Sequence, residues 1–161
     1  MGIVRLNHAV LYVSDASASA RFYVETLDFT VVGSIGDAAI FLRAADSDND
    51  HDLGLFQVGP SASPSAGGRS APRPGLYHLA WQVRTIDELA ATRERLRTAG
   101  ALVGESDHGV SKSLYARDPD GIEFEVMWAV PRDEWPAEIG TWRLDLAAAL
   151  ARWPGLDTSD Q

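Results

Sequence analysis

Two segments of the sequence repeat one pattern at a distance of 70 residues. LNHAVLYV at positions 6–13 and LYHLAWQV at positions 76–83 each place a histidine third in a run of aliphatic, β-branched and aromatic residues. Runs of this composition are typical of β-strands. The pattern predicts that the chain contains two copies of one structural unit. Each copy is expected to begin with a strand whose histidine, His8 or His78, occupies the same place.

The residues after the first histidine strand predict the rest of the first copy. Asp15 is a suitable helix N-cap, and the apolar spacing after it predicts a helix that extends to Leu27. Runs rich in apolar and β-branched residues predict strands at 3–13, 29–34, 38–44 and 52–58. The first copy is therefore a βαβββ module over about residues 3–58.

The second copy follows a segment that is rich in Pro, Gly, Ser and Ala, residues 59–75, which is predicted to be a linker. Thr85 and Glu88 fit a capping box, so a helix is expected to begin there and to continue through Ala99. Gly100 suits the position just after a helix end. Strands are predicted at 75–83, 101–104, 111–117 and 122–129, which completes a second βαβββ module over about residues 76–130.

These elements predict a single α+β domain over residues 1–161, with two tandem modules that pair edge to edge. The two copies are expected to form one curved, half-barrel-like mixed sheet around a shared concave face with a metal site. Residues 131–161 form a helical tail, in which TWRLDLAAALARW places four large apolar residues on one helical face, Trp142, Leu146, Leu150 and Trp153. We expect this helix to pack on the outer sheet or to contact a second subunit, rather than to act as a lid.

The composition restricts the partners and the metal chemistry. The net charge of −9 disfavours binding to nucleic acid, because an acidic surface repels phosphate. The chain has no cysteine, which excludes disulfides and thiolate ligands, so a metal would be held by imidazole and carboxylate groups. No segment is long and apolar enough for a signal peptide or a membrane span. A soluble, cytoplasmic protein is expected.

A third metal ligand is predicted from the last strand, DPDGIEFEVMW. In that strand Glu123, Glu125 and Met127 face one way, and Ile122, Phe124 and Val126 face the other. A carboxylate flanked by apolar residues needs a partner when it is buried, and a divalent cation is an adequate one. His8, His78 and Glu125 would form a 2-His-1-carboxylate site, the facial triad of non-haem Fe(II) oxygenases, although Mn(II), Zn(II) or Ni(II) also suits these ligands.

The repeat, the strand histidines and the DPDG-x3-E ending resemble the vicinal-oxygen-chelate superfamily, which includes glyoxalase I, fosfomycin-resistance transferases, bleomycin-binding proteins and extradiol dioxygenases. The resemblance covers about residues 3–130, and the family's metal ligands match His8, His78 and Glu125. Glyoxalase I uses a fourth ligand, a glutamate in the last strand of its first module. The matching stretch here, residues 53–56, has no carboxylate, which disfavours glyoxalase chemistry. Bleomycin-binding relatives usually lack the metal ligands, so that binding role is also disfavoured.

A longer motif resembles the type I extradiol branch of the family. The sequence reads HGVSKSLYARDPDGIEFE from His108 to Glu125, which matches that branch's spacing of His, Tyr, Asp-Pro-x-Gly and Glu. His51, in DHDLGLF, resembles the branch's acid–base histidine. The resemblance implies a catechol-cleaving dioxygenase with Fe(II) as the expected metal, Mn(II) as a possible one, and O₂ as co-substrate. The ring would open beside its two oxygens to give a muconic semialdehyde-type product.

The resemblance also implies a role for each residue outside the triad. His51 would act as general acid and base, since imidazole titrates near neutral pH. Tyr115 would hydrogen-bond a substrate oxygen near the metal, and His108 another substrate or intermediate oxygen. The expected partner is a small aromatic diol, and relatives of this kind are commonly homodimers.

Two other functions stay open on the sequence alone. One is a metal-dependent transferase or isomerase that resembles the fosfomycin-resistance enzymes and needs neither O₂ nor His51. The other is a non-enzymatic ligand-binding or self-resistance protein, in which ligand affinity would not depend on Glu125. The ring substituents of the substrate cannot be read from the pattern.

Overall fold

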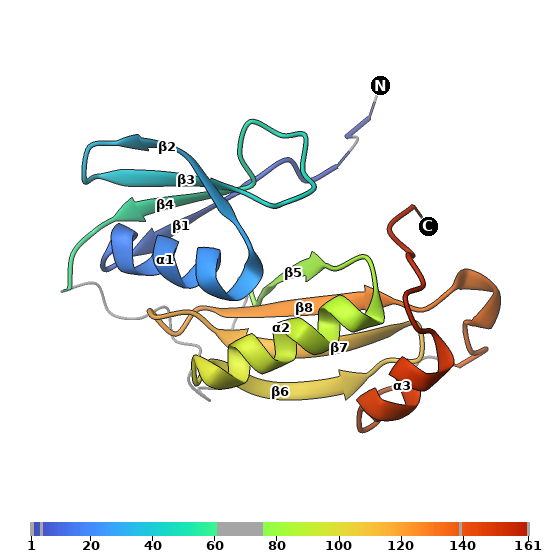
Figure 1. Ribbon diagram of the computed structural model, residues 1–161. Helices are drawn as coiled ribbons and strands as arrows, with labels where there is room; N and C mark the ends of the chain where they lie inside the picture. The colour runs from blue at the N-terminus through green and yellow to red at the C-terminus, as the bar shows by residue number, and fades with distance from the viewer. Residues whose placement is uncertain (1, 4, 61–75, 139, 161) are drawn as a thin grey trace. The chain divides into compact units, whose positions relative to one another are not determined.

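The computed structural model describes residues 2–3, 5–60, 76–138 and 140–160 (Figure 1). They form two compact units. The first holds the described residues before position 61 together with Asp118–Gly121, and the second holds Leu76 to Arg117 and the described residues from Ile122 onward. The units correspond to the two predicted modules, except that the Asp118–Gly121 turn belongs to the first unit and not to the second.

The first unit is built on a four-stranded mixed sheet in the order β1-β4-β3-β2. Its strands are β1 (Ala9–Val13), β2 (Thr30–Ile35), β3 (Ala39–Arg43) and β4 (Leu53–Gln57). β1 runs parallel to β4, and the other neighbours are antiparallel. Because side chains alternate along a strand, Leu11, Val13, Leu53 and Leu55 share one face, where all four are buried. This face forms the core of the unit.

Helix α1 (Ala16–Leu27) packs against this sheet. As predicted, Asp15 caps the helix, because its side chain accepts a hydrogen bond from the N–H of Ala18. The helix ends at Asp28, whose φ of 57° is left-handed, a conformation that Asp tolerates better than most residues. Most of the side chains that the helix buries are small: Ala16, Ser19, Ala20, Tyr23 and Thr26.

The second unit repeats this arrangement with a sheet in the order β5-β8-β7-β6. Its strands are β5 (Leu79–Gln82), β6 (Leu102–Asp107), β7 (Ser111–Arg117) and β8 (Glu123–Ala129), and β5 is parallel to β8. Phe124, Val126 and Trp128 are buried, whereas the alternate residues Glu123 and Glu125 are half-buried on the other face. The predicted division of β8 into an apolar and a carboxylate face is confirmed.

Helix α2 (Ile86–Thr98) packs against the buried face of the second sheet. The predicted capping box is present: Thr85 accepts from the N–H of Glu88, and the Glu88 side chain accepts from the N–H of Thr85. Gly100, just beyond the helix, has a φ of 67°, which fits the predicted helix end. The apolar residues Ile86, Leu89 and Leu96 enter the core from this helix.

The C-terminal tail contains a short 3₁₀ helix (Arg132–Glu134) and helix α3 (Leu146–Arg152). The prediction of a helix that includes Trp142 is wrong, because the backbone of Trp142 forms a bridge with Asp107 through hydrogen bonds of 2.8 and 2.9 Å. Helix α3 contacts helix α2, rather than lying directly on the sheet as predicted, and the ring of Trp153 lies 5.3 Å from that of Trp128 in β8. The predicted homodimer stays a prediction.

Parallel strand pairing defines the equivalent positions of the two modules. His8 immediately precedes β1, and His78 immediately precedes β5. Gly54 pairs with the residue two after His8, and Glu125 pairs with the residue two after His78. The carboxylate of the second module therefore corresponds to a glycine in the first, as the stretch 53–56 suggested.

Other sequence predictions concern boundaries. The histidine strands are shorter than predicted, since β1 begins at Ala9 and β5 at Leu79. Most of the predicted linker, residues 61–75, lies outside the described residues. The edge-to-edge joining of the modules stays a prediction. In the part of the chain that the structure describes, no helix has the length and apolar character that a membrane span requires.

Candidate functional site

The second unit brings two of the three predicted metal ligands together. Nε2 of His78 lies 3.1 Å from Oε2 of Glu125, and their side chains are only 22% and 13% exposed. Glu123, on the same face, is instead paired with Arg117 at 3.4 Å. Glu125 is therefore the carboxylate of β8 that faces the histidine.

Tyr115 stands next to this pair. It is directly opposite Glu125 in the β7–β8 register, and its ring centroid lies 5.8 Å from that of His78. Burial raises the pKa of Tyr115 above its usual value, and the negative charge of Glu125 adds to the rise. The hydroxyl of Tyr115 therefore stays protonated at neutral pH and can donate a hydrogen bond to a bound oxygen.

His108 completes this cluster from the turn before β7. Its Nε2 lies 2.8 Å from the hydroxyl oxygen of Tyr115. On the other side of the ring, Nδ1 lies 3.1 Å from Oγ1 of Thr141 in the C-terminal tail. Four predicted site residues, His78, Glu125, Tyr115 and His108, thus form one connected group within the second unit.

The first unit brings the other two predicted residues together. The ring centroids of His8 and His51 are 4.5 Å apart, and the ring of Phe41 lies 5.1 Å from that of His51. His8 precedes β1 and His51 precedes β4, and these two strands are parallel neighbours. The parallel pairing therefore accounts for the meeting of two histidines that are far apart in the sequence.

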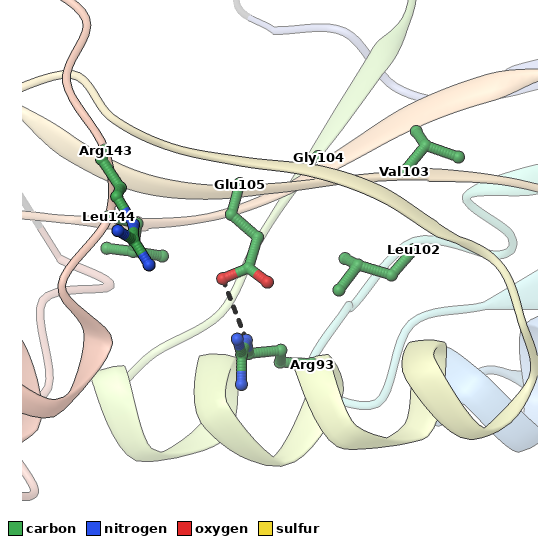
Figure 2. Close-up of a pocket in the computed structure, with 7 residues that line it drawn as sticks. All are labelled: Arg93, Leu102, Val103, Gly104, Glu105, Arg143 and Leu144. Atoms are coloured by element: carbon green, nitrogen blue, oxygen red, sulfur yellow. Dashed lines mark hydrogen bonds and ion pairs between the residues drawn. The ribbon is translucent and has the colours of Figure 1, made fainter.

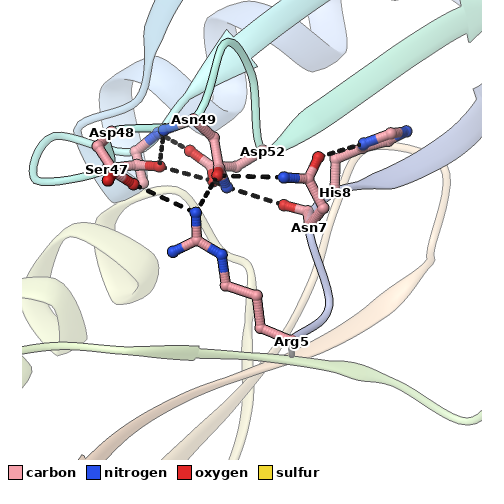
Figure 3. A network of polar contacts seen from close by, with 8 residues as sticks. Arg5, Asn7, His8, Ser47, Asp48, Asn49 and Asp52 are labelled. Carbon is pink, nitrogen blue, oxygen red and sulfur yellow. Dashed lines mark hydrogen bonds and ion pairs between the residues drawn. The ribbon is translucent and has the colours of Figure 1, made fainter. Parts of the chain in front are cut away.

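A polar network orients His8 (Figure 3). The Nδ1 of His8 lies 2.8 Å from Oδ1 of Asn7. The side chain of Asn49 donates to the carbonyl of Asn7 at 2.9 Å and to the carboxylate of Asp52 at 2.7 Å, which ties the segment before β1 to the loop before β4. An amide oxygen only accepts, so the ring proton of neutral His8 resides on Nδ1 and the lone pair of Nε2 remains for a ligand.

Asp50 orients His51 in a similar way. The Nδ1 of His51 lies 2.8 Å from Oδ2 of Asp50. This hydrogen bond is the main reason that the pKa of Asp50 is lowered, so the Asp50 side chain is a carboxylate at neutral pH. A carboxylate only accepts, which keeps a proton on Nδ1 and directs proton exchange to Nε2.

The donor set of the second unit fits a divalent metal. Two ligand atoms about 2.1 Å from a metal and about 90° apart are separated by about 3.0 Å, and the His78–Glu125 distance is 3.1 Å. Nδ1 of His78 is buried without a hydrogen-bond partner among the described residues. A histidine placed only for packing would usually have its ring nitrogens paired. The chemistry and spacing of these two groups suit neighbouring metal ligands.

The described residues contain no cluster of three or more His, Cys, Asp or Glu side chains that could hold a metal. The second unit supplies a His–Glu pair, and the first supplies His8 with Nε2 available. The complete triad of His8, His78 and Glu125 stays a prediction.

Sequence reasoning missed the three residues that orient histidines: Asn7, Asp50 and Thr141. Asn7 and Asp50 each directly precede the histidine that they hold, so a polar residue before a candidate histidine was an available signal. Thr141 lies 33 residues after His108, and nothing in the local sequence connects the two.

A pocket of about 430 Å³ lies in the second unit between α2, β6 and the tail (Figure 2). Arg93 and Arg143 contribute guanidinium groups to it, and the Nε of Arg93 donates to Glu105 at 2.9 Å. None of the predicted site residues lines this pocket. It is therefore distinct from the His78–Glu125 group.

Comparison with known proteins agrees with this arrangement. A sequence model described as the Glyoxalase/Bleomycin resistance protein/Dioxygenase superfamily matches residues 5–126. A solved glyoxylase/bleomycin resistance protein/dioxygenase domain from Frankia sp. EAN1pec is 27% identical and superposes with a TM-score of 0.60. The match covers 81% of this chain and 96% of that one.

Two curated relatives are named as ring-diol dioxygenases. The catechol-2,3-dioxygenase of Bacillus subtilis (strain 168) is 31% identical over 130 residues, which are 81% of this chain and 43% of that protein. The biphenyl-2,3-diol 1,2-dioxygenase 3 of Rhodococcus globerulus is 33% identical over 126 residues, 76% of this chain and 62% of that protein. The chain thus spans about half the length of these two relatives.

Proposed function

Because the chain belongs to the glyoxalase/bleomycin resistance protein/dioxygenase superfamily, we propose that it is an extradiol dioxygenase. It would cleave a catechol-type ring with O₂ at a metal held by His8, His78 and Glu125. The observation that supports this function most directly is the His78–Glu125 pair, 3.1 Å apart and adjacent to the hydrogen-bonded Tyr115 and His108. A dioxygenase needs these proton-handling groups, whereas simple ligand binding does not.

Fe(II) is the proposed metal, because two histidines and one carboxylate are the ligand set of non-haem Fe(II) oxygenases, and Mn(II) is the alternative. When bound, the metal would supply a Lewis acid that lowers the pKa of the catechol hydroxyls and open positions for substrate and O₂. The protein's own contribution is to orient the ligands and to place donors and acceptors of protons around them.

Tyr115 would bind an oxygen of the deprotonated substrate. Its raised pKa keeps the hydroxyl protonated, and a protonated hydroxyl stabilises an oxyanion by donating to it. The same hydroxyl lies 2.8 Å from Nε2 of His108, which connects the substrate oxygen to a second proton-handling group. Tyr115 and His108 would act together, so that a change of charge on the substrate oxygen reaches His108 through the Tyr115 hydroxyl.

His51 would exchange protons with the reacting oxygens through Nε2. Asp50 holds the opposite ring nitrogen at 2.8 Å, so the ring has a defined orientation. A histidine oriented by a carboxylate is a recurrent arrangement for a general acid and base. The side chain of His51 is 18% exposed, which leaves it partly accessible to a ligand.

The first sheet offers an apolar surface next to His51. Phe41 and Phe56 pack edge to face with centroids 6.0 Å apart, and Val10 lies in the same register row as Phe41. Val10 is 50% exposed. An apolar, aromatic face beside a proton-transfer histidine suits the ring of a small aromatic diol, which is the proposed substrate class.

The test is oxygen uptake by anaerobically purified protein reconstituted with Fe(II), on a panel of catechols, together with the absorbance of the semialdehyde product. Variants Glu125→Ala, His8→Ala and His51→Ala are assayed in parallel, and bound iron is measured in each. Glu123→Gln is the matched control, because Glu123 shares the face of Glu125 but pairs with Arg117.

We expect the wild type and Glu123→Gln to consume O₂. Glu125→Ala and His8→Ala should lose both iron and activity, whereas His51→Ala should keep iron and lose most activity. Iron-loaded wild type that consumes no O₂ on a broad panel would favour the transferase or isomerase function. Retention of iron by Glu125→Ala and His8→Ala would contradict the ligand assignment.

A further inference from the structure

We infer that Thr141, in the C-terminal tail, is a positioning residue that sets the orientation of His108 against Tyr115. The inference rests on the proposed function for its catalytic consequence. The match to the family model ends at residue 126, so Thr141 lies beyond the segment that this model describes. The role of Thr141 rests on the contacts that it makes in this structure.

The ring of His108 is held at both nitrogens. Nε2 lies 2.8 Å from the hydroxyl of Tyr115, and Nδ1 lies 3.1 Å from Oγ1 of Thr141. A 180° rotation of the ring would remove both contacts, because it exchanges nitrogen for carbon at each place. The two contacts together thus select one ring orientation. Without the Thr141 contact, only the contact with Tyr115 would remain to hold the ring.

The backbone fixes the place of Thr141. The N–H of Trp142 donates to the carbonyl of Asp107 at 2.8 Å, and the N–H of Asp107 donates to the carbonyl of Trp142 at 2.9 Å. These bonds join the residue after Thr141 to the residue before His108. The side chain of Asp107 is itself held by the N–H of Gly109 at 2.8 Å and by Nζ of Lys112 at 2.5 Å. Thr141 and His108 are therefore neighbours on a firmly bonded pair of segments.

Gly109 allows the tail to approach this closely. Its φ is 76°, which favours glycine, and a Cβ at this position would lie 2.6 Å from Cγ of Pro136. The nearby ring of Trp135 is also anchored, since its Nε1 donates to the carbonyl of Val130 at 2.7 Å. The tail thus has specific contacts around the turn that carries His108.

A threonine suits this task because its hydroxyl can both donate and accept. It can accept from a protonated Nδ1 of His108 and donate to an unprotonated one. The ring can therefore keep its orientation while protons move at Nε2. A serine retains this property, whereas valine has a similar shape without a hydroxyl.

The test combines ring nitrogen NMR with kinetics on the full-length, iron-reconstituted protein and its Zn(II)-loaded, diamagnetic form. Histidines are labelled with ¹⁵N, and the four histidine rings are assigned by single substitution. Thr141→Val, Thr141→Ser and the control Arg143→Ala are compared. Arg143 is an exposed neighbour in the tail whose side chain lies at the pocket of Figure 2 and not at His108.

We expect Thr141→Val to shift the ¹⁵N signals of the His108 ring and to lower kcat about tenfold, with KM and iron content within twofold of the wild type. Thr141→Ser and Arg143→Ala should resemble the wild type in all four measurements. Unchanged His108 signals in Thr141→Val would overturn the inference, as would an equal loss of kcat in Thr141→Ser. A wild type that consumes no O₂ would contradict the proposed function, and the His108 spectra would still decide whether Thr141 positions the ring.

Discussion

The two modules share one topology but present different side chains at matching positions. Their sheets have the same strand order, and their helix caps, Asp15 and Thr85, are 70 residues apart like the two histidines. In the row that contains Glu125 and Tyr115 in the second sheet, the first sheet has Gly54 and Phe41. One copy offers a carboxylate and a phenol where the other offers a glycine and a phenyl ring.

The difference shows which positions the repeat constrains. The buried strand residues Leu53 and Leu55 of β4 correspond to Phe124 and Val126 of β8, and all four are apolar because a helix must pack on the sheet in each copy. The opposite faces are free to diverge: the three atoms nearest to an added Cβ at Gly54 are apolar atoms of Val10, Phe56 and Phe41, at 3.4–3.7 Å. The second module thus supplies most of the polar chemistry, and the first supplies an apolar surface and two oriented histidines.

The largest expected effect concerns the buried positions that the modules share. Phe124 and Leu53 occupy equivalent places in β8 and β4, and both are at most 2% exposed. We expect Phe124→Ala to lower the free energy of unfolding by about 3–5 kcal/mol and Leu53→Ala by about 2–5 kcal/mol, because each leaves a cavity. Urea unfolding followed by circular dichroism measures both.

Val10→Ala is the control for these two substitutions. Val10 lies on the opposite face of the first sheet and is 50% exposed, so its loss should cost less than about 1 kcal/mol. A cost for Val10→Ala as large as that of Leu53→Ala would show that the face opposite α1 is also a packed core. The proposed division between buried and open faces would then be wrong.

The sequence predicted what depends on local pattern and repetition. The Thr85–Glu88 capping box and the two faces of β8 follow from short-range spacing, which needs only neighbouring residues and a strand period of two. The matching places of His8 and His78 follow from the repeat, and the structure has all of these features. The apolar neighbours of Glu125 favoured it over Glu123 as a ligand, and the resemblance to the family implies the same carboxylate.

What the sequence did not predict depends on long-range contacts. The amphipathic spacing from Trp142 favoured one continuous helix, but pairing with Asp107 satisfies the backbone of Trp142 in a bridge, so the helix begins only at Leu146. The contact between Thr141 and His108 spans 33 residues and involves one exposed hydroxyl. Neither feature has a local signature, because each depends on how the tail returns to β6.

The second prediction tests the contrast between Glu125 and its counterpart Gly54. Glu125→Gln should weaken Fe(II) binding at least about a hundredfold, since it removes a charged ligand. Gly54→Ala should change the affinity less than threefold, because the new Cβ makes only ordinary contacts. Equilibrium dialysis under anaerobic conditions measures both, and comparable losses in the two variants would contradict the assignment of the ligand to the second module.

The third prediction concerns the matching helix positions Tyr23 and Arg93. The Tyr23 hydroxyl donates to the buried carboxylate of Asp118 at 3.2 Å within the first unit, whereas Arg93 pairs with Glu105 on β6. We expect Tyr23→Phe to lower the free energy of unfolding at pH 7 by about 2 kcal/mol, because the lost hydrogen bond has a charged acceptor. Urea titration at pH 7 gives the value.

The pH dependence of the same variant has a defined sign. Burial is the main cause that raises the pKa of Tyr23 well above its usual value of about 10, followed by the charge of Asp118. The folded protein therefore binds this proton more tightly than the unfolded chain. Its stabilising contribution is complete below about pH 10 and is lost as the pH rises further toward the folded pKa. Tyr23→Phe should show a flatter decline from about pH 10 to about pH 11, the first unit above the usual tyrosine pKa, and a decline as steep as that of the wild type would exclude Tyr23 as its source.

The smallest expected effect concerns the Asp50–His51 hydrogen bond, which only the first module has. Asp50 and His51 precede β4, whereas the equivalent places before β8 are Gly121 and Ile122, so the second module has no oriented histidine there. In Asp50→Asn the side-chain amide can donate or accept, and it no longer keeps the proton of His51 on Nδ1. We expect kcat to fall about tenfold with KM and bound iron unchanged.

Asp48→Asn, in the same loop and 87% exposed, should keep full activity. Because the two variants remove the same charge a few residues apart, equal losses would mean that the loop's charge matters and not the orientation of His51, and equal retention would show that His51 needs no partner to exchange protons.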